Sequence, residues 1–471
     1  MKLRNTRRDF LRIAASSVVA LSTSKISLLE AEVIPPVRGW VTSKDKRYVE
    51  IDSLHWRDRI ADSRTAIRLD PTQRYQEILG FGAAFTDASC YLMGKLSPEQ
   101  RSALLSELFG ASGLRLSVCR TCIGSSDYST AAYSFDDGVE PDPELKRFSA
   151  EHDREYILPA LRAARALNPD LFLFSTPWSP PGWMKAGGSM LGGSMEKRYF
   201  GPYADYFVRF LQAYSNEGVK INAVTIQNEV DTDQDGRMPA ALWGQEYEME
   251  FVKRYLAPAI QRASLDTKIW ILDHNYNLWG RAVDELSDPD VNKYVDGVAW
   301  HAYVGTPDSM TRVHNAFPEK NCYWTEGGPD ITSPDYSTDW VKWSHTFTGG
   351  LRNWARCIVG WNLLLDENGR PNIGPFRCGG LVTLDSQTHK ISNSGQYWAF
   401  AHYSKLIQRG ARVIASDGQL PGIDHVGFEN PDGSHVLVLT NQGEARAVQC
   451  ELKRQALDLT LDPDSVTTLA W

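Results

Sequence analysis

Eight short apolar segments alternate with segments of helical periodicity between residues 78 and 364. Several of them are nearly continuous apolar runs, which is typical of parallel strands covered by helices on both faces. Eight such strand–helix units in succession predict a closed (β/α)8 barrel, an α/β fold. An open doubly wound sheet is the alternative, although no glycine-rich phosphate-binding motif follows the first segment. The predicted strands are residues 78–84, 114–121, 171–176, 223–227, 268–273, 297–303, 322–325 and 357–364.

Helix signals lie between these strands. Ser97 is suited to cap a helix whose first turn contains Pro98, because proline needs no backbone N–H partner there. Further helical patterns cover residues 156–167, 201–218 and 245–264. With 471 residues, the chain is long enough for one large barrel and a smaller unit.

The two ends of the chain have a different pattern. Residues 47–51 and 65–69 are short alternating segments, and the pattern after about residue 406 is entirely of the strand type. Residues 457–461 alternate strictly between apolar and polar side chains. We therefore expect an all-β sandwich domain built from N- and C-terminal segments. The expected organisation is a leader at 1–31, N-terminal sandwich strands at 32–75, the catalytic barrel at 76–405 and the C-terminal sandwich at 406–471.

The N-terminus has features of an export signal. Arg7-Arg8 is followed by Phe10-Leu11 and then by a moderately apolar run at residues 13–21. This pattern resembles a twin-arginine signal peptide, which predicts a periplasmic or secreted protein. The sequence leaves the cleavage point open.

Composition excludes several classes of partner. The formal net charge of −8 and the isoelectric point near 5.8 argue against nucleic acid. No run of about 18 apolar residues is present, so we expect no membrane span.

Seven cysteines leave at least one unpaired within a monomer. Cys119 and Cys122 have CxxC spacing, but nothing nearby completes a zinc site, so we expect them to be structural.

Two of the predicted strands deliver a glutamate to their C-terminal ends. Glu229 follows the fourth strand and Glu326 follows the seventh. On a barrel these ends share one rim, where two carboxyl groups about 5–5.5 Å apart cleave a glycosidic bond with retention. We expect Glu229 to be the general acid/base, with a pKa raised by burial and by the other carboxylate. We expect Glu326 to be the nucleophile, kept ionised by Arg120 at the end of the second strand.

Four sequence motifs follow one another along the chain. They are Gly80–Asp87 (GFGAAFTD), Thr176–Lys185 (TPWSPPGWMK), Gln227-Asn228-Glu229 and Thr325-Glu326-Gly327. Together they resemble glycoside hydrolase family 30, and most of all its glucosylceramidase-like branch, over roughly residues 65–471. The resemblance implies a (β/α)8 barrel with a β-sandwich joined to its side. It also implies retaining β-glycosidase activity without a cofactor or a metal, with the same two glutamates as the catalytic pair.

Polar and aromatic residues near the strand ends are candidates for substrate binding. Asn228 can bond the sugar 2-hydroxyl, a contact that strengthens at the transition state. Asp127 can accept bonds from two sugar hydroxyls, and Tyr303 can donate to the nucleophile. The remaining candidates are Trp178 and Trp361 as walls of the sugar pocket, His301 after the sixth strand, and Asn372, which resembles a substrate-contacting asparagine of the family.

These candidates have structural alternatives. Core packing is the alternative for Trp178 and Trp361, a buried structural histidine for His301, and a loop turn for Asp127 and Asn372. The alternatives stay open at the level of sequence.

The segment after the acid/base candidate departs from the family pattern. Val230 stands where the family often has proline, and residues 231–236 are polar and acidic. This segment lacks the final glutamate of a calcium loop, so we expect a rim loop that shapes the leaving-group side. A polar rim makes ceramide doubtful as the leaving group. We expect an enzyme that hydrolyses a β-glucoside, either an oligosaccharide or a glycolipid. The alternative functions are those of a β-1,6-glucanase, a β-xylosidase or an inactive carbohydrate-binding protein. The oligomeric state is open.

Overall fold

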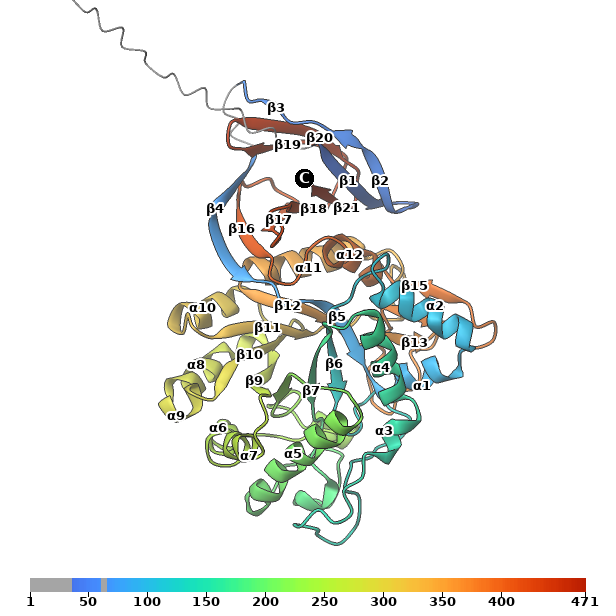
Figure 1. Ribbon diagram of the computed structural model, residues 1–471, viewed down its shortest axis with the longest axis vertical. Helices are drawn as coiled ribbons and strands as arrows, with labels where there is room; N and C mark the ends of the chain where they lie inside the picture. The colour runs from blue at the N-terminus through green and yellow to red at the C-terminus, as the bar shows by residue number, and fades with distance from the viewer. Residues whose placement is uncertain (1–35, 61–65) are drawn as a thin grey trace, which may run out of the picture. The chain divides into compact units, whose positions relative to one another are not determined.

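The computed structural model describes residues 36–60 and 66–471, so the proposed export signal lies outside the described residues. Eight parallel strands form a closed barrel (Figure 1), and each predicted strand segment supplies one of them. The predicted fold class is confirmed. The barrel strands are β5 (Gly80–Phe85), β6 (Val118–Cys122), β7 (Phe172–Thr176), β8 (Ala223–Thr225), β9 (Lys268–Asn275), β10 (Val295–His301), β11 (Asn321–Glu326) and β12 (Ala355–Gly360).

Aromatic side chains fill the interior of the barrel. Trp270 stacks on Tyr323 with ring centroids 3.8 Å apart, and Phe174 lies 5.0 Å from the same tryptophan. The strands also approach closely: a Cβ at Gly82 would lie 1.7 Å from the carbonyl oxygen of Val118, so only glycine fits there. Because the interior is packed, functional side chains are left to the rim at the carboxyl ends of the strands.

Strand β9 contains a bulge near its C-terminal end. In the pairing with β10, Leu272 lies opposite Ala299 and His274 lies opposite Trp300, so Asp273 is an extra residue. Leu272 and Asp273 have φ angles of 72° and 48°. A bulge of this kind changes the direction in which side chains point. Here it leaves both Asp273 and His274 buried, at 0% and 6% exposure.

Helices surround the barrel strands (Figure 1). Helix α2 begins with a capping box, in which Ser97 and Gln100 satisfy each other's backbone N–H groups. The predicted helix at 245–264 is formed by α6 and α7 with one π-helical stretch between them. The α-helices are α1 (Asp87–Lys95), α2 (Pro98–Phe109), α3 (Glu151–Glu155), α4 (Ile157–Leu167), α5 (Phe200–Asn216), α6 (Gln245–Phe251), α7 (Ala257–Arg262), α8 (Trp279–Ser287), α9 (Pro289–Asn292), α10 (Asp308–Ala316), α11 (Trp340–Arg352) and α12 (Gly395–Ser404). Shorter helical turns are η1 (Gly182–Met184), η2 (Lys197–Tyr199), η3 (Gln234–Gly236), η4 (Val252–Leu256) and η5 (Tyr276–Leu278).

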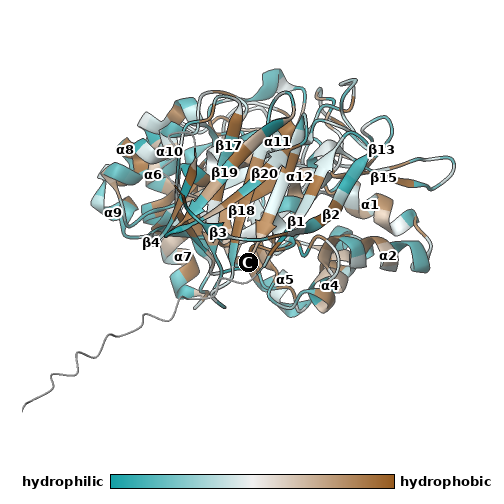
Figure 2. Ribbon diagram, turned by 90° about the horizontal axis from the view of Figure 1, so that it is seen from above, coloured by the Kyte–Doolittle hydropathy of each residue, from teal (hydrophilic) through white to brown (hydrophobic). Residues whose placement is uncertain are grey.

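A ten-stranded sheet combines the two ends of the described chain in the order β2-β1-β21-β18-β17-β16-β4-β19-β20-β3. It curls so that β19 and β20 lie over β17, β18 and β21 (Figures 1 and 2). The expected sandwich from N- and C-terminal segments is therefore present. Its strands are β1 (Val37–Ser43), β2 (Lys46–Leu54), β3 (Arg57–Asp58), β4 (Ile67–Glu77), β16 (Arg412–Asp417), β17 (Ile423–Glu429), β18 (His435–Asn441), β19 (Arg446–Leu452), β20 (Gln455–Leu461) and β21 (Ser465–Ala470).

Helices α11 and α12 join this sheet to the barrel. Both contact strands of the sheet, whose apolar residues appear brown above them in Figure 2. Polar pairs also cross the interface: Ser344 Oγ lies 2.6 Å from Thr440 Oγ1, and both ring nitrogens of His402 lie 2.8 Å from threonine hydroxyls. The two parts are thus held by apolar packing with a few buried hydrogen bonds.

A small third sheet was not predicted. The segment at 357–364 was expected to be one strand, but β12 ends at Gly360 and a new strand begins at Leu364. Trp361 and Asn362 therefore lie at the turn between two sheets. The third sheet consists of β13 (Leu364–Asp366), β14 (Val382–Leu384) and β15 (Ile391–Asn393).

All seven cysteines are free thiols, and six of them are buried. Cys119 and Cys122 lie on β6 in the barrel wall, where burial raises the pKa of Cys119 to about 12. Within residues 36–60 and 66–471, no helix combines the length and the apolar character needed to cross a bilayer.

Candidate active site

A cavity of about 350 Å³ opens at the carboxyl ends of the barrel strands. This volume is within the range of about 300–1,000 Å³ that is usual for small-molecule sites. Seven of the predicted site residues line it: Asp127, Trp178, Asn228, Glu229, Tyr303, Glu326 and Trp361. Arg120 and His301 are fully buried beside these and contact the glutamates directly. Asn372 neither lines the cavity nor contacts either glutamate among the described residues.

Glu326 is the last residue of β11 and is only 5% exposed. Arg120 donates from Nη1 to its Oε2 at 2.5 Å, and the hydroxyl of Tyr303 donates to its Oε1 at 3.0 Å. Both contacts expected from the sequence are therefore present. Burial raises the pKa of Glu326, although the charges of His301 and Arg120 oppose that rise.

Glu229 follows β8 in a left-handed backbone conformation, with a φ angle of 55°. Its N–H donates to the carbonyl oxygen of Asp273 at 3.1 Å, which ties this unusual conformation to β9. Oε1 lies 3.4 Å from Nε2 of His274 and 3.5 Å from Nδ1 of His301. Oε2 accepts a bond of 2.7 Å from Gln234 in the following loop.

The raised pKa expected for Glu229 is wrong. Burial does raise the pKa of its carboxyl group, but the contacts with His274 and His301 outweigh burial and lower the pKa overall. Burial lowers the pKa of His274, yet Asp231 and Glu229 outweigh it and raise this pKa to about 9. The two imidazoles thus stabilise the charged form of Glu229.

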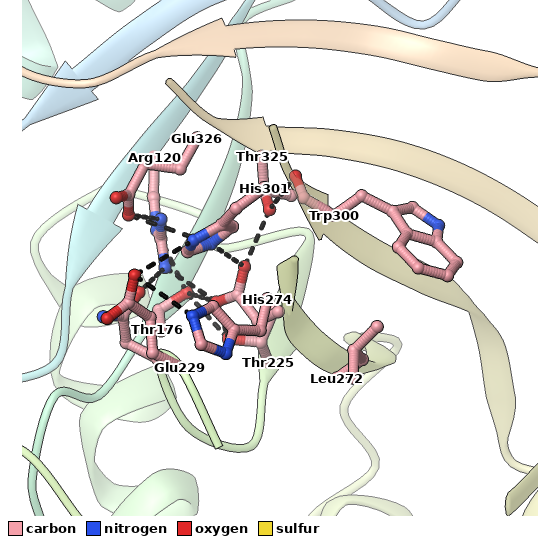
Figure 3. A network of polar contacts seen from close by, with 12 residues as sticks. Arg120, Thr176, Thr225, Glu229, Leu272, His274, Trp300, His301, Thr325 and Glu326 are labelled. Carbon is pink, nitrogen blue, oxygen red and sulfur yellow. Dashed lines mark hydrogen bonds and ion pairs between the residues drawn. The ribbon is translucent and has the colours of Figure 1, made fainter. Parts of the chain in front are cut away.

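The ring of His301 contacts both glutamates. Its Nδ1 lies 3.5 Å from Oε1 of Glu229, and its Nε2 lies 3.8 Å from Oε2 of Glu326 and 3.1 Å from Oδ1 of Asp273 (Figure 3). One imidazole can meet both carboxylates only if their side chains converge. The structure therefore brings together the two glutamates that the sequence places 97 residues apart.

Asp273 is the centre of the buried polar network beside the cavity. Its carboxylate accepts from Arg120 at 2.7 Å and from the hydroxyls of Thr176, Thr225 and Thr325 at 3.0, 2.7 and 2.7 Å. Burial alone would raise its pKa, but the charge of Arg120 leads the contacts that lower it. Asp273 thereby holds the guanidinium that contacts Glu326.

The wall of the cavity has the features of a sugar pocket. Trp178 and Trp361 stack with centroids 5.0 Å apart, and the guanidinium of Arg120 lies 4.6 Å from the Trp178 ring centroid. Among the described residues, Oδ1 of the buried Asp127 has no hydrogen-bond partner, so it can accept from a sugar hydroxyl. Arg120 also donates to Oδ1 of Asn228 at 2.8 Å, which leaves the amide NH2 group of Asn228 for another partner.

Asn372 stabilises its own loop instead of the pocket. Its Nδ2 donates to the carbonyl oxygen of Phe376 at 2.5 Å, and its Oδ1 accepts from the backbone N–H of Gly374 at 2.6 Å. This is the turn role that the sequence left open. Phe376 and Cys378 of the same loop reach the cavity in its place.

Several residues of the site were not predicted. His274 and Asn275 follow Asp273 as a polar run at the end of an apolar strand, the same signal that pointed to Asn228 and Glu229. This signal was available for β9 and could have identified them. The other unpredicted lining residues are Gln234, Met238, Phe376 and Cys378, which come from loops without a comparable pattern.

A closed barrel with two convergent glutamates at its carboxyl rim, Glu326 buried and Glu229 half-buried, is the arrangement of a glycoside hydrolase. Residues 78–407 match the glycosyl hydrolase family 30 TIM-barrel domain, and residues 410–469 match the family 30 β-sandwich domain. The chain belongs to glycoside hydrolase family 30, and it is a glycosidase of β-glycoside substrates.

Relatives of two kinds are similar to this chain. An endo-1,6-β-D-glucanase of Neurospora crassa is 35% identical over 396 residues, which cover 79% of this chain and 80% of the relative. The lysosomal acid glucosylceramidase of Mus musculus is 29% identical over 399 residues, covering 80% and 77%. Among solved structures, the endo-β1,6-glucanase BT3312 has a TM-score of 0.84 at 29% identity and covers 92% of this chain and 99% of its own.

Proposed function

We propose that Glu326 is the nucleophile and Glu229 the general acid/base in the retaining hydrolysis of β-glucosidic bonds. The observation that carries this assignment is the different surroundings of the two carboxylates. Glu326 is held by the fixed charge of Arg120 and by Tyr303, as suits a group that must stay ionised and well oriented. Glu229 is surrounded by two imidazoles, which can supply and receive a proton.

The reaction proceeds in two steps. In the first, Glu326 attacks the anomeric carbon and forms a glycosyl–enzyme ester, while Glu229 protonates the departing glycosidic oxygen. The imidazoles of His274 and His301 lie 3.4 and 3.5 Å from Oε1 of Glu229, so they are placed to pass a proton to this oxygen before or during that step. In the second step, Glu229 takes a proton from water, the water oxygen bonds to the anomeric carbon, and Glu326 leaves as a carboxylate.

A pair of variants tests which glutamate does what. Glu326→Gln should abolish turnover of every β-glucoside, because no ester can form. Glu229→Gln should abolish turnover of substrates with poor leaving groups but keep a single-turnover burst with an activated aryl β-glucoside, whose leaving group needs no proton. The exposed Glu144→Gln variant is the control and should behave as wild type. A burst in Glu326→Gln and none in Glu229→Gln would reverse the assignment.

The leaving-group side favours a sugar over ceramide. Gln234 of the loop after Glu229 contacts the acid/base, and Asp231 pairs with its histidine neighbour, so this loop puts polar side chains next to the proposed proton donor. We therefore propose a β-1,6-linked glucan as the preferred substrate, which fits the similarity to two endo-1,6-glucanases. Initial rates on gentio-oligosaccharides, glucosylceramide and aryl β-xyloside compare the candidates directly. A clear preference for glucosylceramide would refute the argument from the polar rim.

We also propose that the N-terminal twin-arginine segment exports the protein. Its support is the sequence pattern around Arg7 and Arg8. Fractionation of cells that express wild type or the Arg7→Lys/Arg8→Lys double variant tests this. Export that is unchanged in the double variant would contradict it.

A further inference from the structure

Three side chains at the acid/base have the spacing of a metal site. The nearest atoms of Glu229, His274 and His301 all lie within 4.8 Å of one another. Glu229 Oε1 is 3.4 Å from Nε2 of His274 and 3.5 Å from Nδ1 of His301. In a tetrahedral site with bonds of about 2.1 Å, two ligand atoms are about 3.4 Å apart. Two of the three edges therefore already have the required length.

The far side of each imidazole is held by a carboxylate. Nδ1 of His274 pairs with Asp231, and Nε2 of His301 lies 3.1 Å from Asp273. Histidines that bind metals usually donate their second N–H to a carboxylate, which orients the ring and makes the metal-binding nitrogen more basic. Both rings of this cluster have that support, so the nitrogens that face Glu229 are the ones left for a cation.

The inward nitrogens make few contacts with protein atoms that a cation would have to replace. His301 is fully buried, and among the described residues its Nδ1 has no hydrogen-bond partner. In the neutral tautomer of His274 that can bind a metal, Nε2 faces the amide nitrogen of Asn275 at 3.0 Å, a contact that a cation would replace. Glu229 and His274 both line the cavity, which gives a cation a path of entry and a place for a water ligand.

The donor set defines the class of cation. Two imidazole nitrogens and one carboxylate oxygen suit Zn²⁺ and neighbouring transition-metal ions, whereas Mg²⁺ and Ca²⁺ prefer oxygen ligands. A cation at this position would bond Oε1 of Glu229, the oxygen nearest to both imidazoles. While it is bound, that oxygen can neither give nor take a proton.

We propose that Glu229, His274 and His301 form an inhibitory site for Zn²⁺, and that the bound ion takes Glu229 out of catalysis. Metal binding does not depend on the catalytic role of Glu229, whereas inhibition rests on the role proposed for it above. The site is thus a control on the glycosidase and supplies no chemistry to it.

Two measurements on the metal-free full chain test the proposal. Calorimetric titration with ZnCl2 should show one ion bound per chain, and the same concentrations should inhibit aryl β-glucoside hydrolysis reversibly, with recovery on chelation. MgCl2 should do neither. Asp231→Asn, which removes a carboxylate outside the metal ligands, should weaken zinc binding by about 10- to 100-fold. His274→Ala should weaken binding at least as much, with inhibition expressed relative to its own metal-free rate.

The exposed His345→Ala variant is the matched control and should keep both zinc affinity and inhibition. Zinc affinity that is equal in wild type and His274→Ala would overturn the site. If zinc binding depends on His274 but leaves wild-type activity intact, the proposed inhibition is wrong. That result would also count against Glu229 as the proton donor, whereas the metal site itself would be supported.

Discussion

His402 should make the stability of this protein sensitive to mild acid. The residue lies on α12, fully buried against the ten-stranded sheet, and its ring nitrogens contact only the hydroxyls of Thr468 and Thr42. Within residues 36–60 and 66–471 no carboxylate is paired with it, so a proton on this ring would be a buried charge without a counter-ion. Burial accordingly lowers the pKa of His402 from 6.5 to about 3.

The size of the effect follows from proton linkage. The pKa of His402 is lower in the folded protein than in the unfolded chain. Between about pH 3 and pH 6.5, the unfolded chain therefore binds a proton that the folded protein does not bind. The contribution of His402 to stability is present above pH 6.5 and is lost as the pH falls. Each pKa unit corresponds to about 1.4 kcal/mol, so going from pH 7 to pH 5 should cost about 2 kcal/mol of unfolding free energy from this residue alone.

Urea denaturation at pH 7 and pH 5 measures this loss, with His402→Gln as the perturbation. The variant should be less stable than wild type at pH 7, because it loses packing and hydrogen bonds, but its difference between the two pH values should be smaller by about 2 kcal/mol. His345→Gln is the control of opposite sign, because Asp424 raises the pKa of His345 and stabilises the fold at low pH. An identical pH dependence in His402→Gln and wild type would refute the reasoning.

Three further predictions concern the site and one helix. Tyr303→Phe removes a hydrogen-bond donor to Glu326, which should favour the protonated form of Glu326. The acidic limb of the pH profile of kcat/KM should therefore move to higher pH by about one unit. A limb that does not move would contradict this prediction. Asp127→Asn should lower kcat/KM for β-glucosides by about 10- to 100-fold, because one of the two carboxyl oxygens that can contact sugar hydroxyls is replaced by an NH2 group. A normal circular dichroism spectrum would exclude misfolding as the cause. Ser97→Ala breaks the capping box of α2 and should cost about 1 kcal/mol in thermal or urea unfolding; no loss would show that Gln100 caps the helix alone.

The residues at the rim of the barrel could be predicted from the sequence, because the end of each strand along the chain is also a point on the rim. A buried parallel strand has a nearly continuous apolar signal, and the polar residue that follows it must lie at the carboxyl edge of the barrel. This rule placed Arg120, Glu229 and Glu326 at one site before any coordinates were considered. The same rule applied to β9 would have found His274.

The bulge in β9 could not be predicted in this way. Leu272 and Asp273 adopt positive φ angles without being glycine, so neither carries a composition signal for such a conformation. Only pairing with β10 forces the extra residue into the strand, and only then does Asp273 reach Arg120. Asn372 was misplaced for a related reason: resemblance places a residue in a loop, but the loop's own hydrogen bonds decide where its side chain points.

The sequence by itself determined the fold class, the family and the identity of the two glutamates, because these depend on residue order and on periodicity along the chain. The tertiary structure decided what surrounds each glutamate. His274 and His301 reach Glu229 from other strands of the barrel, and the pKa of its carboxyl group depends on such distances. No pattern along the chain encodes a distance between strands, so the lowered pKa of Glu229 and the zinc site proposed around it could be inferred only from the folded molecule.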